Sequence, residues 1–124
     1  MDIILWIVQG VLAVLYLLAG VPKVTRPITS LSKRVSWISA VPAWLVRFIG
    51  VAEVLGALGL ILPLLTGILP GLTVAAATGL IVLQVCAVFF HFSRGEATSV
   101  PINAALMLLA VFIVIGRVWF VPVA

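Results

Sequence analysis

The sequence predicts an all-α integral membrane protein, a four-helix bundle with a short amphipathic interfacial helix between spans one and two. Its ten charged residues leave three charge-free stretches, residues 3–22, 54–93 and 97–116. Since about 20 apolar residues cross a bilayer as a helix, these stretches fit one, two and one spans. Hydrophobic residues make up 65% of the chain and charged residues 8%, which excludes a soluble globular domain. We expect a single membrane domain over residues 1–124, surrounded by the lipid bilayer.

Prolines and glycines divide the apolar stretches into spans. The long stretch is interrupted at Pro63, Gly67 and the pair Pro70-Gly71, which are helix-ending signals spaced for a tight uncharged hairpin. Pro22 is expected to end the first span in the same way. The four expected spans cover about residues 3–22, 43–63, 71–92 and 101–120.

The segment between the first and second spans repeats apolar residues at helical spacing. Its apolar positions fall three, four and three residues apart, with polar residues between them. We interpret residues 28–39 as a short helix in the membrane interface, with its basic face toward the lipid headgroups. A solvated, irregular loop is the alternative. The residues expected at the membrane surface are Lys33, Arg34 and Trp37.

The net charge of +4 is concentrated beside the membrane. Five of the seven basic residues lie between Lys23 and Arg47, directly after the first span. A basic loop next to a span is a topology signal, and it gives no reason to expect a nucleic acid partner. Six basic residues fall on the side of the first and third loops, whereas only Arg117 approaches the other side. We therefore expect those loops in the cytoplasm and both termini outside the cell membrane.

Composition also restricts the chemistry. The sequence holds one cysteine and one histidine, which excludes an internal disulfide relay and a bis-histidine haem within one chain. No CxxC, HExxH, GxGxxG or P-loop pattern occurs, and no metal site is expected. No cofactor is evident apart from a quinone or a lipid taken up from the membrane. For the isolated chain, the sequence favours a non-enzymatic role.

Polar residues inside the spans indicate where a site would lie, because they cost free energy in lipid and normally face the bundle interior. Such residues lie in the same half of the bilayer, nearer the first and third loops, in four different spans: Tyr16, Glu53, Gln84 and Asn103. Two of them are followed seven residues later, on the same helix face, by Lys23 and His91. The candidate ligand-binding or proton-handling residues are Glu53, Lys23, His91, Asn103, Tyr16 and Gln84.

Glu53 is the most informative of these residues, because a carboxylate within a span must be neutralised, hydrogen-bonded or paired. Small residues surround it on its helix face and allow another helix to approach. Two interpretations remain open. Glu53 is either a proton-handling group or ligand anchor, or a structural partner of Lys23, His91 or Arg47.

Two further features concern the other helix faces. Arg117 is expected to extend toward the far interface, with Asp2 as a partner. Gly71, Ala75 and Gly79 form a ridge of small residues on the face opposite the polar one, which predicts a helix contact. We expect a homodimer or a heteromeric membrane partner along this third span, with a contact inside the bundle as the alternative.

Two strings resemble the DoxX-like family: LLAGVPK at residues 17–23 and IGVAEVLG at residues 49–56. HFSRGE at residues 91–96, followed by an apolar span, is similar to the smaller members. The resemblance implies four spans with an amphipathic first loop. Named members are associated with a thiosulfate:quinone oxidoreductase subunit, a mycobacterial membrane oxidoreductase complex and, more distantly, a vertebrate receptor chaperone. The positions that match the family pattern are Lys23, Glu53, His91, Arg94 and Arg117.

Three functions are compatible with these features. The first is an accessory or scaffold subunit of a membrane complex, redox-linked or quinone-linked by analogy with the family, whose polar cluster holds a lipid-like or quinone-like ligand. The second is a small dimeric proton-coupled transporter that uses Glu53. Small multidrug transporters carry their glutamate in the first span, however, and this chain does not. The third is a purely structural or chaperone-like membrane protein.

Overall fold

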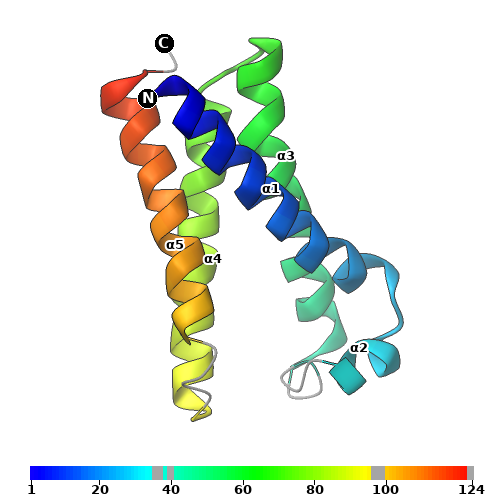
Figure 1. The fold of residues 1–124 in the computed structure, drawn as a ribbon. Helices are drawn as coiled ribbons and strands as arrows, with labels where there is room; N and C mark the ends of the chain where they lie inside the picture. Colours follow the sequence, from blue (N-terminus) through cyan, green and yellow to red (C-terminus); the bar gives the residue numbers. More distant parts are fainter. Residues whose placement is uncertain (35–37, 39–40, 96–99, 123–124) are drawn as a thin grey trace.

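The computed structural model describes residues 1–34, 38, 41–95 and 100–122. In this part of the chain, four helical segments are long and apolar enough to cross a membrane. Figure 1 shows them as one bundle, and the predicted all-α four-helix membrane fold is confirmed. The segments are α1 (Asp2–Thr25), α3 (Ala43–Thr66), α4 (Leu72–Ser93) and α5 (Val100–Ile115), the last continued by the π-helical turn η3 (Gly116–Phe120).

Two prolines that were expected to end spans lie inside helices instead. Pro22 and Pro63 are each followed by three more helical residues. Each proline lacks the N–H that would bond the carbonyl four residues earlier, so one helical hydrogen bond is missing there, yet the helix continues past it. The ends are set by the residues that follow. Arg26 precedes Pro27 and is extended, with φ −89° and ψ 151°, whereas Gly67 ends α3 in the left-handed conformation at φ 73°.

The four long helices form two pairs. α1 packs along α3, and α4 packs along α5, while α3 also contacts α4. Figure 1 shows that the pairs approach each other on the side that carries both chain termini and diverge toward the first and third loops. We call these two ends of the bundle the terminal side and the loop side. The divergence leaves the inner helix faces of the two pairs farther apart on the loop side.

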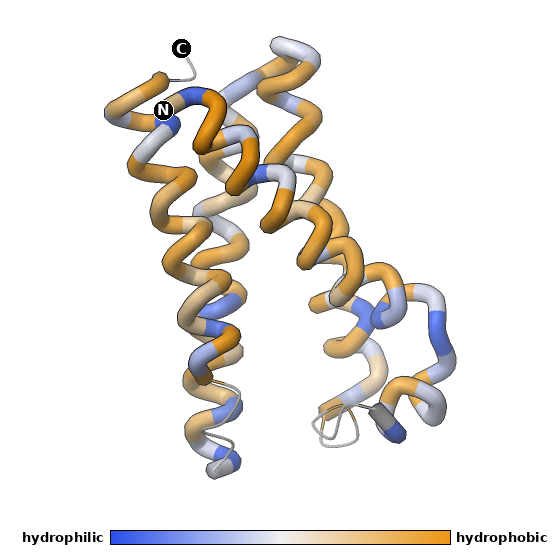
Figure 2. The backbone as a smooth tube through the Cα atoms, viewed as in Figure 1, coloured by the Kyte–Doolittle hydropathy of each residue, from blue (hydrophilic) through white to orange (hydrophobic). Residues whose placement is uncertain are grey.

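Side chains are distributed as expected for a protein surrounded by lipid. Large apolar residues are exposed on the outside of every long helix, for example Ile3 at 75%, Leu18 at 70% and Phe89 at 71%. Figure 2 shows the same pattern, with apolar tube along most of each helix. The buried polar residues, by contrast, lie on the inner faces: Gln9, Glu53, Thr73, Gln84 and Arg117.

The predicted amphipathic helix is present as α2 (Ile28–Arg34). Its apolar side packs on the chain itself, because Leu31 and Ile38 are buried against Val46 at the start of α3. Lys33 is exposed. Apart from Ile38, the rest of the expected helix, including Trp37, lies outside the described residues.

Candidate functional site

α1 crosses α3 where two glycines meet. A β-carbon on Gly50 would lie 2.7 Å from the Lys23 Cβ and 2.9 Å from the Gly20 carbonyl oxygen. A β-carbon on Gly20 would lie 2.9 Å from the Glu53 Cβ. Because neither glycine has a side chain, the two helix backbones can come into direct contact. This close approach brings Lys23 of α1 beside Glu53 of α3.

Lys23 and Glu53 form an ion pair. The Lys23 ammonium donates a hydrogen bond of 2.6 Å to the Glu53 Oε1, and the two side chains are only 16% and 6% exposed. Of the three basic residues considered as partners for Glu53, Lys23 is thus the one with which the carboxylate forms a salt bridge in the described part of the chain. A nearby cation compensates for the cost of burying the carboxylate.

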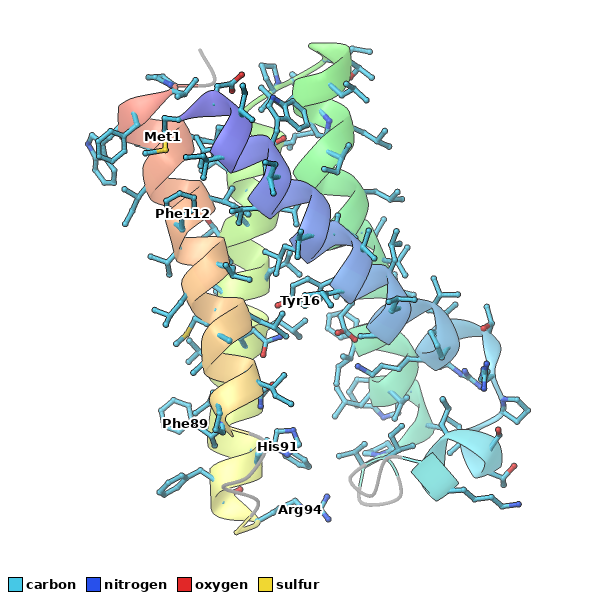
Figure 3. All side chains as sticks on the ribbon, in the orientation of Figure 1. Met1, Tyr16, Phe89, His91, Arg94 and Phe112 are labelled. Atoms are coloured by element: carbon cyan, nitrogen blue, oxygen red, sulfur yellow. The ribbon has the colours of Figure 1, made fainter. Side chains whose placement is uncertain are left out.

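Tyr16 and Gln84 connect the two helix pairs. The Gln84 Nε2 donates a hydrogen bond of 2.8 Å to the Tyr16 hydroxyl. Figure 3 shows Tyr16 directed from α1 toward α4, near the level at which the pairs diverge. Gln84 is 5% exposed, and its Oε1 has no hydrogen-bond partner among the described residues. The amide therefore retains an unused acceptor beside the diverging region.

The remaining candidates lie on the other helix pair. Figure 3 shows His91 and Arg94 directed from α4 toward the α1–α3 side, whereas Phe89 points away. The His91 ring meets the Phe90 ring edge-on, with centroids 5.6 Å apart. Asn103 lies seven residues before the buried Ala110, on the inner face of α5, and its Nδ2 is buried without a partner among the described residues.

Four of the six predicted site residues therefore form two hydrogen-bonded pairs. The other two, His91 and Asn103, lie on α4 and α5. Lys23 bonds Glu53, and Tyr16 bonds Gln84. No described hydrogen bond joins His91 or Asn103 to either pair. The physical reason is the divergence of the helix pairs on the loop side, which separates the residues of the two pairs at that end.

The terminal side contains a second polar cluster around Arg117. The expectation that this side chain extends to the interface is wrong, because Arg117 is 2% exposed. Its Nε donates to the Gln9 Oε1 at 2.8 Å and its Nη1 to the Asp2 Oδ1 at 2.6 Å, so Asp2 is a partner, as expected. The π-helical turn η3 and the close packing of Gly116 on Leu5 hold Arg117 within the bundle.

Comparison with protein-family models adds the decisive observation. The model of the DoxX-like family matches residues 7–113. The chain belongs to the DoxX-like family. Comparisons with curated proteins and with solved structures gave no match. Of the positions taken to match the family pattern, Arg117 lies beyond the matched residues of this DoxX-like protein.

In this DoxX-like protein, one polar stripe runs along the whole of α1. Asp2, Gln9, Tyr16 and Lys23 follow one another at intervals of seven residues, and each bonds another helix. Gln9 uses both ends of its amide, since its Nε2 also donates to the Leu60 carbonyl at 2.6 Å. Sequence reasoning missed Gln9. The seven-residue interval between Tyr16 and Lys23, extended toward the N-terminus, would have found it.

The donor set of the DoxX-like protein suits hydrogen bonding rather than metal binding. Among the residues that the structure describes, no group of three histidine, cysteine or acidic side chains is placed to hold a metal ion. The side chains directed into the bundle instead offer a phenol, two amides and an ion pair. Such groups recognise carbonyl or hydroxyl groups on a ligand.

Proposed function

We propose that this DoxX-like protein is an accessory or scaffold subunit of a membrane complex and that it binds a small amphipathic ligand between its two helix pairs. The ligand is lipid-like or quinone-like, with a polar head and an apolar tail. Six residues would contact or orient the head: Tyr16, Lys23, Glu53, Gln84, His91 and Asn103.

The observation that carries this proposal is a pair of unused amide atoms on the inner faces. The Gln84 Oε1 needs a donor and the Asn103 Nδ2 needs an acceptor, and both atoms are buried without partners among the described residues. Leaving such an atom unsatisfied costs about 1–3 kcal/mol. A hydroxyl on the head group would donate to the Gln84 Oε1, and a hydroxyl or carbonyl oxygen would accept from the Asn103 Nδ2, which would recover part of that cost.

The surroundings support an amphipathic ligand. The pairs diverge on the loop side, where the polar inner-face residues lie, and the outer faces of the same helices are apolar. A tail could therefore remain in contact with lipid while the head reaches the amides. Polar groups within spans commonly mark such binding positions.

Ligand binding is tested with the full chain in lipid nanodiscs. A benzoquinone with a decyl tail and its reduced quinol are the probes, and mass spectrometry of the purified protein detects lipids that were retained from the membrane. We expect Asn103→Leu to reduce binding of both probes about tenfold, and Gln84→Leu to reduce binding of the quinol, whose hydroxyl can donate to the Gln84 Oε1, by a similar factor, that of one lost hydrogen bond of about 1.4 kcal/mol.

The matched control is Thr78→Val. Thr78 lies on the exposed face of the same helix as Gln84, and its hydroxyl donates only to the Val74 carbonyl of its own helix. Its loss should leave binding unchanged. Failure of the wild-type protein to retain either a quinone or a lipid, or equal binding by all variants, would contradict the proposal.

The accessory role is supported by a membrane-facing groove between α3 and α4. Its cavity volume is about 420 Å³, and it is lined only by apolar side chains and glycines. Gly79 borders it, and a β-carbon there would meet no atom within 4 Å. Gly71, Ala75 and Gly79 are all exposed, so this face is free to receive a helix of a second copy or of another subunit.

The ion pair at Glu53 favours the accessory role over the transporter alternative. A proton-coupled transporter needs a carboxylate that exchanges protons with solvent, whereas the Glu53 side chain is 6% exposed and bonded to Lys23. For orientation, we propose cytoplasmic first and third loops and external termini, from the distribution of basic residues. Labelling of single cysteines from each side of intact cells tests this orientation.

A further inference from the structure

The carbonyl of Lys23 has no helical donor. In an α-helix this oxygen accepts a hydrogen bond from the N–H of the residue four positions later. Here that residue is Pro27. Proline has no N–H. Pro27 also forces Arg26 out of the helical conformation, so α1 ends at Thr25 and leaves this carbonyl at its C-terminus.

Arg47 of α3 supplies the missing donor. Its Nη1 donates a hydrogen bond of 2.7 Å to the Lys23 carbonyl oxygen, across 24 residues of sequence. A guanidinium also suits this position electrostatically, because the C-terminal end of a helix carries partial negative charge. The sequence suggested Arg47 as a partner for the Glu53 carboxylate, but in the structure it bonds the backbone of the residue that pairs with Glu53.

At the crossing of α1 and α3, two residues of α3 thus bond Lys23. Arg47 holds the Lys23 backbone, and Glu53, six residues later on α3, receives the Lys23 ammonium. Gly50 lies between them and lets α1 come close enough for both contacts. One helix, α3, therefore bonds both the backbone carbonyl and the side chain of Lys23.

We propose that Arg47 is the positioning residue of the Lys23–Glu53 ion pair, and that it acts by replacing the amide hydrogen that Pro27 lacks. Arg47 directs the Lys23 ammonium toward Glu53 by fixing the backbone from which it extends. This inference rests on the proposed ligand site, because Lys23 and Glu53 are two of its residues. Its test needs no ligand. It can therefore fail while the proposed function stands, and the reverse also holds.

The test measures how fast an amine-reactive acetylating reagent modifies Lys23 in the full chain in detergent, with peptide mass spectrometry as the readout. The exposed Lys33 serves as an internal reference in every sample. Arg47→Met removes the donor and keeps an apolar side chain. We expect Lys23 to react about fivefold faster relative to Lys33, the factor for the loss of one typical hydrogen bond.

Two further variants separate positioning from general effects. Arg26→Met removes an exposed positive charge close in sequence to Lys23 and should leave the ratio unchanged. Pro27→Ala restores an N–H at the residue that follows Arg26 and lets α1 continue by one residue. The double variant Pro27→Ala/Arg47→Met should therefore return the Lys23 ratio to the wild-type value.

The rescue decides the outcome. An unchanged Lys23 ratio in folded Arg47→Met would overturn the proposal, and so would a double variant that reacts like Arg47→Met alone. If Arg47→Met does not fold, the double variant is assayed directly. A folded double variant with the wild-type ratio supports the proposal, whereas its failure to fold shows that Arg47 does more than replace the Pro27 donor and overturns it.

Discussion

Gln84 donates a 2.8 Å hydrogen bond to the hydroxyl of Tyr16 and thereby links α4 to α1, which belong to different helix pairs of the bundle. The bond lies near the level where the pairs begin to diverge. It is buried, since Tyr16 is 1% and Gln84 5% exposed. The contact therefore joins the pairs at the boundary between the terminal side, where they approach each other, and the loop side, where they diverge.

We predict that Tyr16→Phe lowers the free energy of unfolding by about 1–3 kcal/mol, because the buried Gln84 amide loses its one described partner. Unfolding by titration with sodium dodecyl sulfate measures this change. The double variant Tyr16→Phe/Gln84→Leu replaces both groups by apolar ones and should be less destabilised than the sum of the single variants. Strict additivity would show that the hydrogen bond contributes nothing.

Glu53→Gln should retain the fold, because an amide can still accept a hydrogen bond from Lys23. Glu53→Leu should lower the free energy of unfolding by an amount on the order of 1–3 kcal/mol, since it leaves the Lys23 ammonium without this acceptor. The same detergent titration measures both variants. Lys23→Met/Glu53→Leu is the control that removes both charges and should recover part of the loss. Equal stability of the wild-type, glutamine and leucine forms would rule out a structural role for the pair.

Gly50→Ala should destabilise the crossing of α1 and α3 by about 1–3 kcal/mol, because the new methyl group would lie 2.7 Å from the Lys23 Cβ. Gly79→Ala is the matched control. A β-carbon there meets no atom within 4 Å, so alanine should be neutral or stabilise the helix by up to about 1 kcal/mol. Thermal unfolding followed by circular dichroism compares the two. A neutral Gly50→Ala would mean that the helices do not touch at this point.

Arg117→Met should lower the free energy of unfolding by about 1.5–3 kcal/mol, the range for hydrogen bonds to charged groups, because it leaves the buried Gln9 amide without a donor. Asp2→Asn should have a smaller effect, since the Asp2 side chain is 57% exposed. Arg26→Met is an exposed arginine control. If Arg117→Met were as mild as Arg26→Met, the side chain would extend to the interface after all.

Gly79→Leu should shift the detergent-solubilised protein to a smaller species without unfolding it, because leucine would occupy the groove between α3 and α4 that we propose as a helix-docking face. Size-exclusion chromatography with light scattering measures the mass. Gly10→Leu is the control on another helix, where a β-carbon also meets no atom within 4 Å. An unfolded Gly79→Leu would place the ridge inside the bundle, and an unchanged mass would remove this face as the contact.

Local properties of the sequence determined the membrane fold. Charge-free stretches of about 20 residues predict helical spans because a helix is the simplest way to satisfy the backbone in lipid, whatever the other helices do. The hairpin at Gly67 and the amphipathic α2 were predicted for the same reason, since turn chemistry and periodicity depend on near neighbours. The depth of Tyr16, Glu53 and Gln84 also followed from counting residues along each helix.

Only the tertiary structure decided which of these residues meet. Gln9 and Arg117 are 108 residues apart, and their bond depends on how η3 packs against α1. Lys23 became the partner of Glu53 because Gly20 and Gly50 let α1 touch α3, while the divergence of the pairs kept His91 and Asn103 from bonding to it within the described residues. Periodicity gives the face and the depth of a side chain, but contact requires the crossing of two helices, which depends on residues of both.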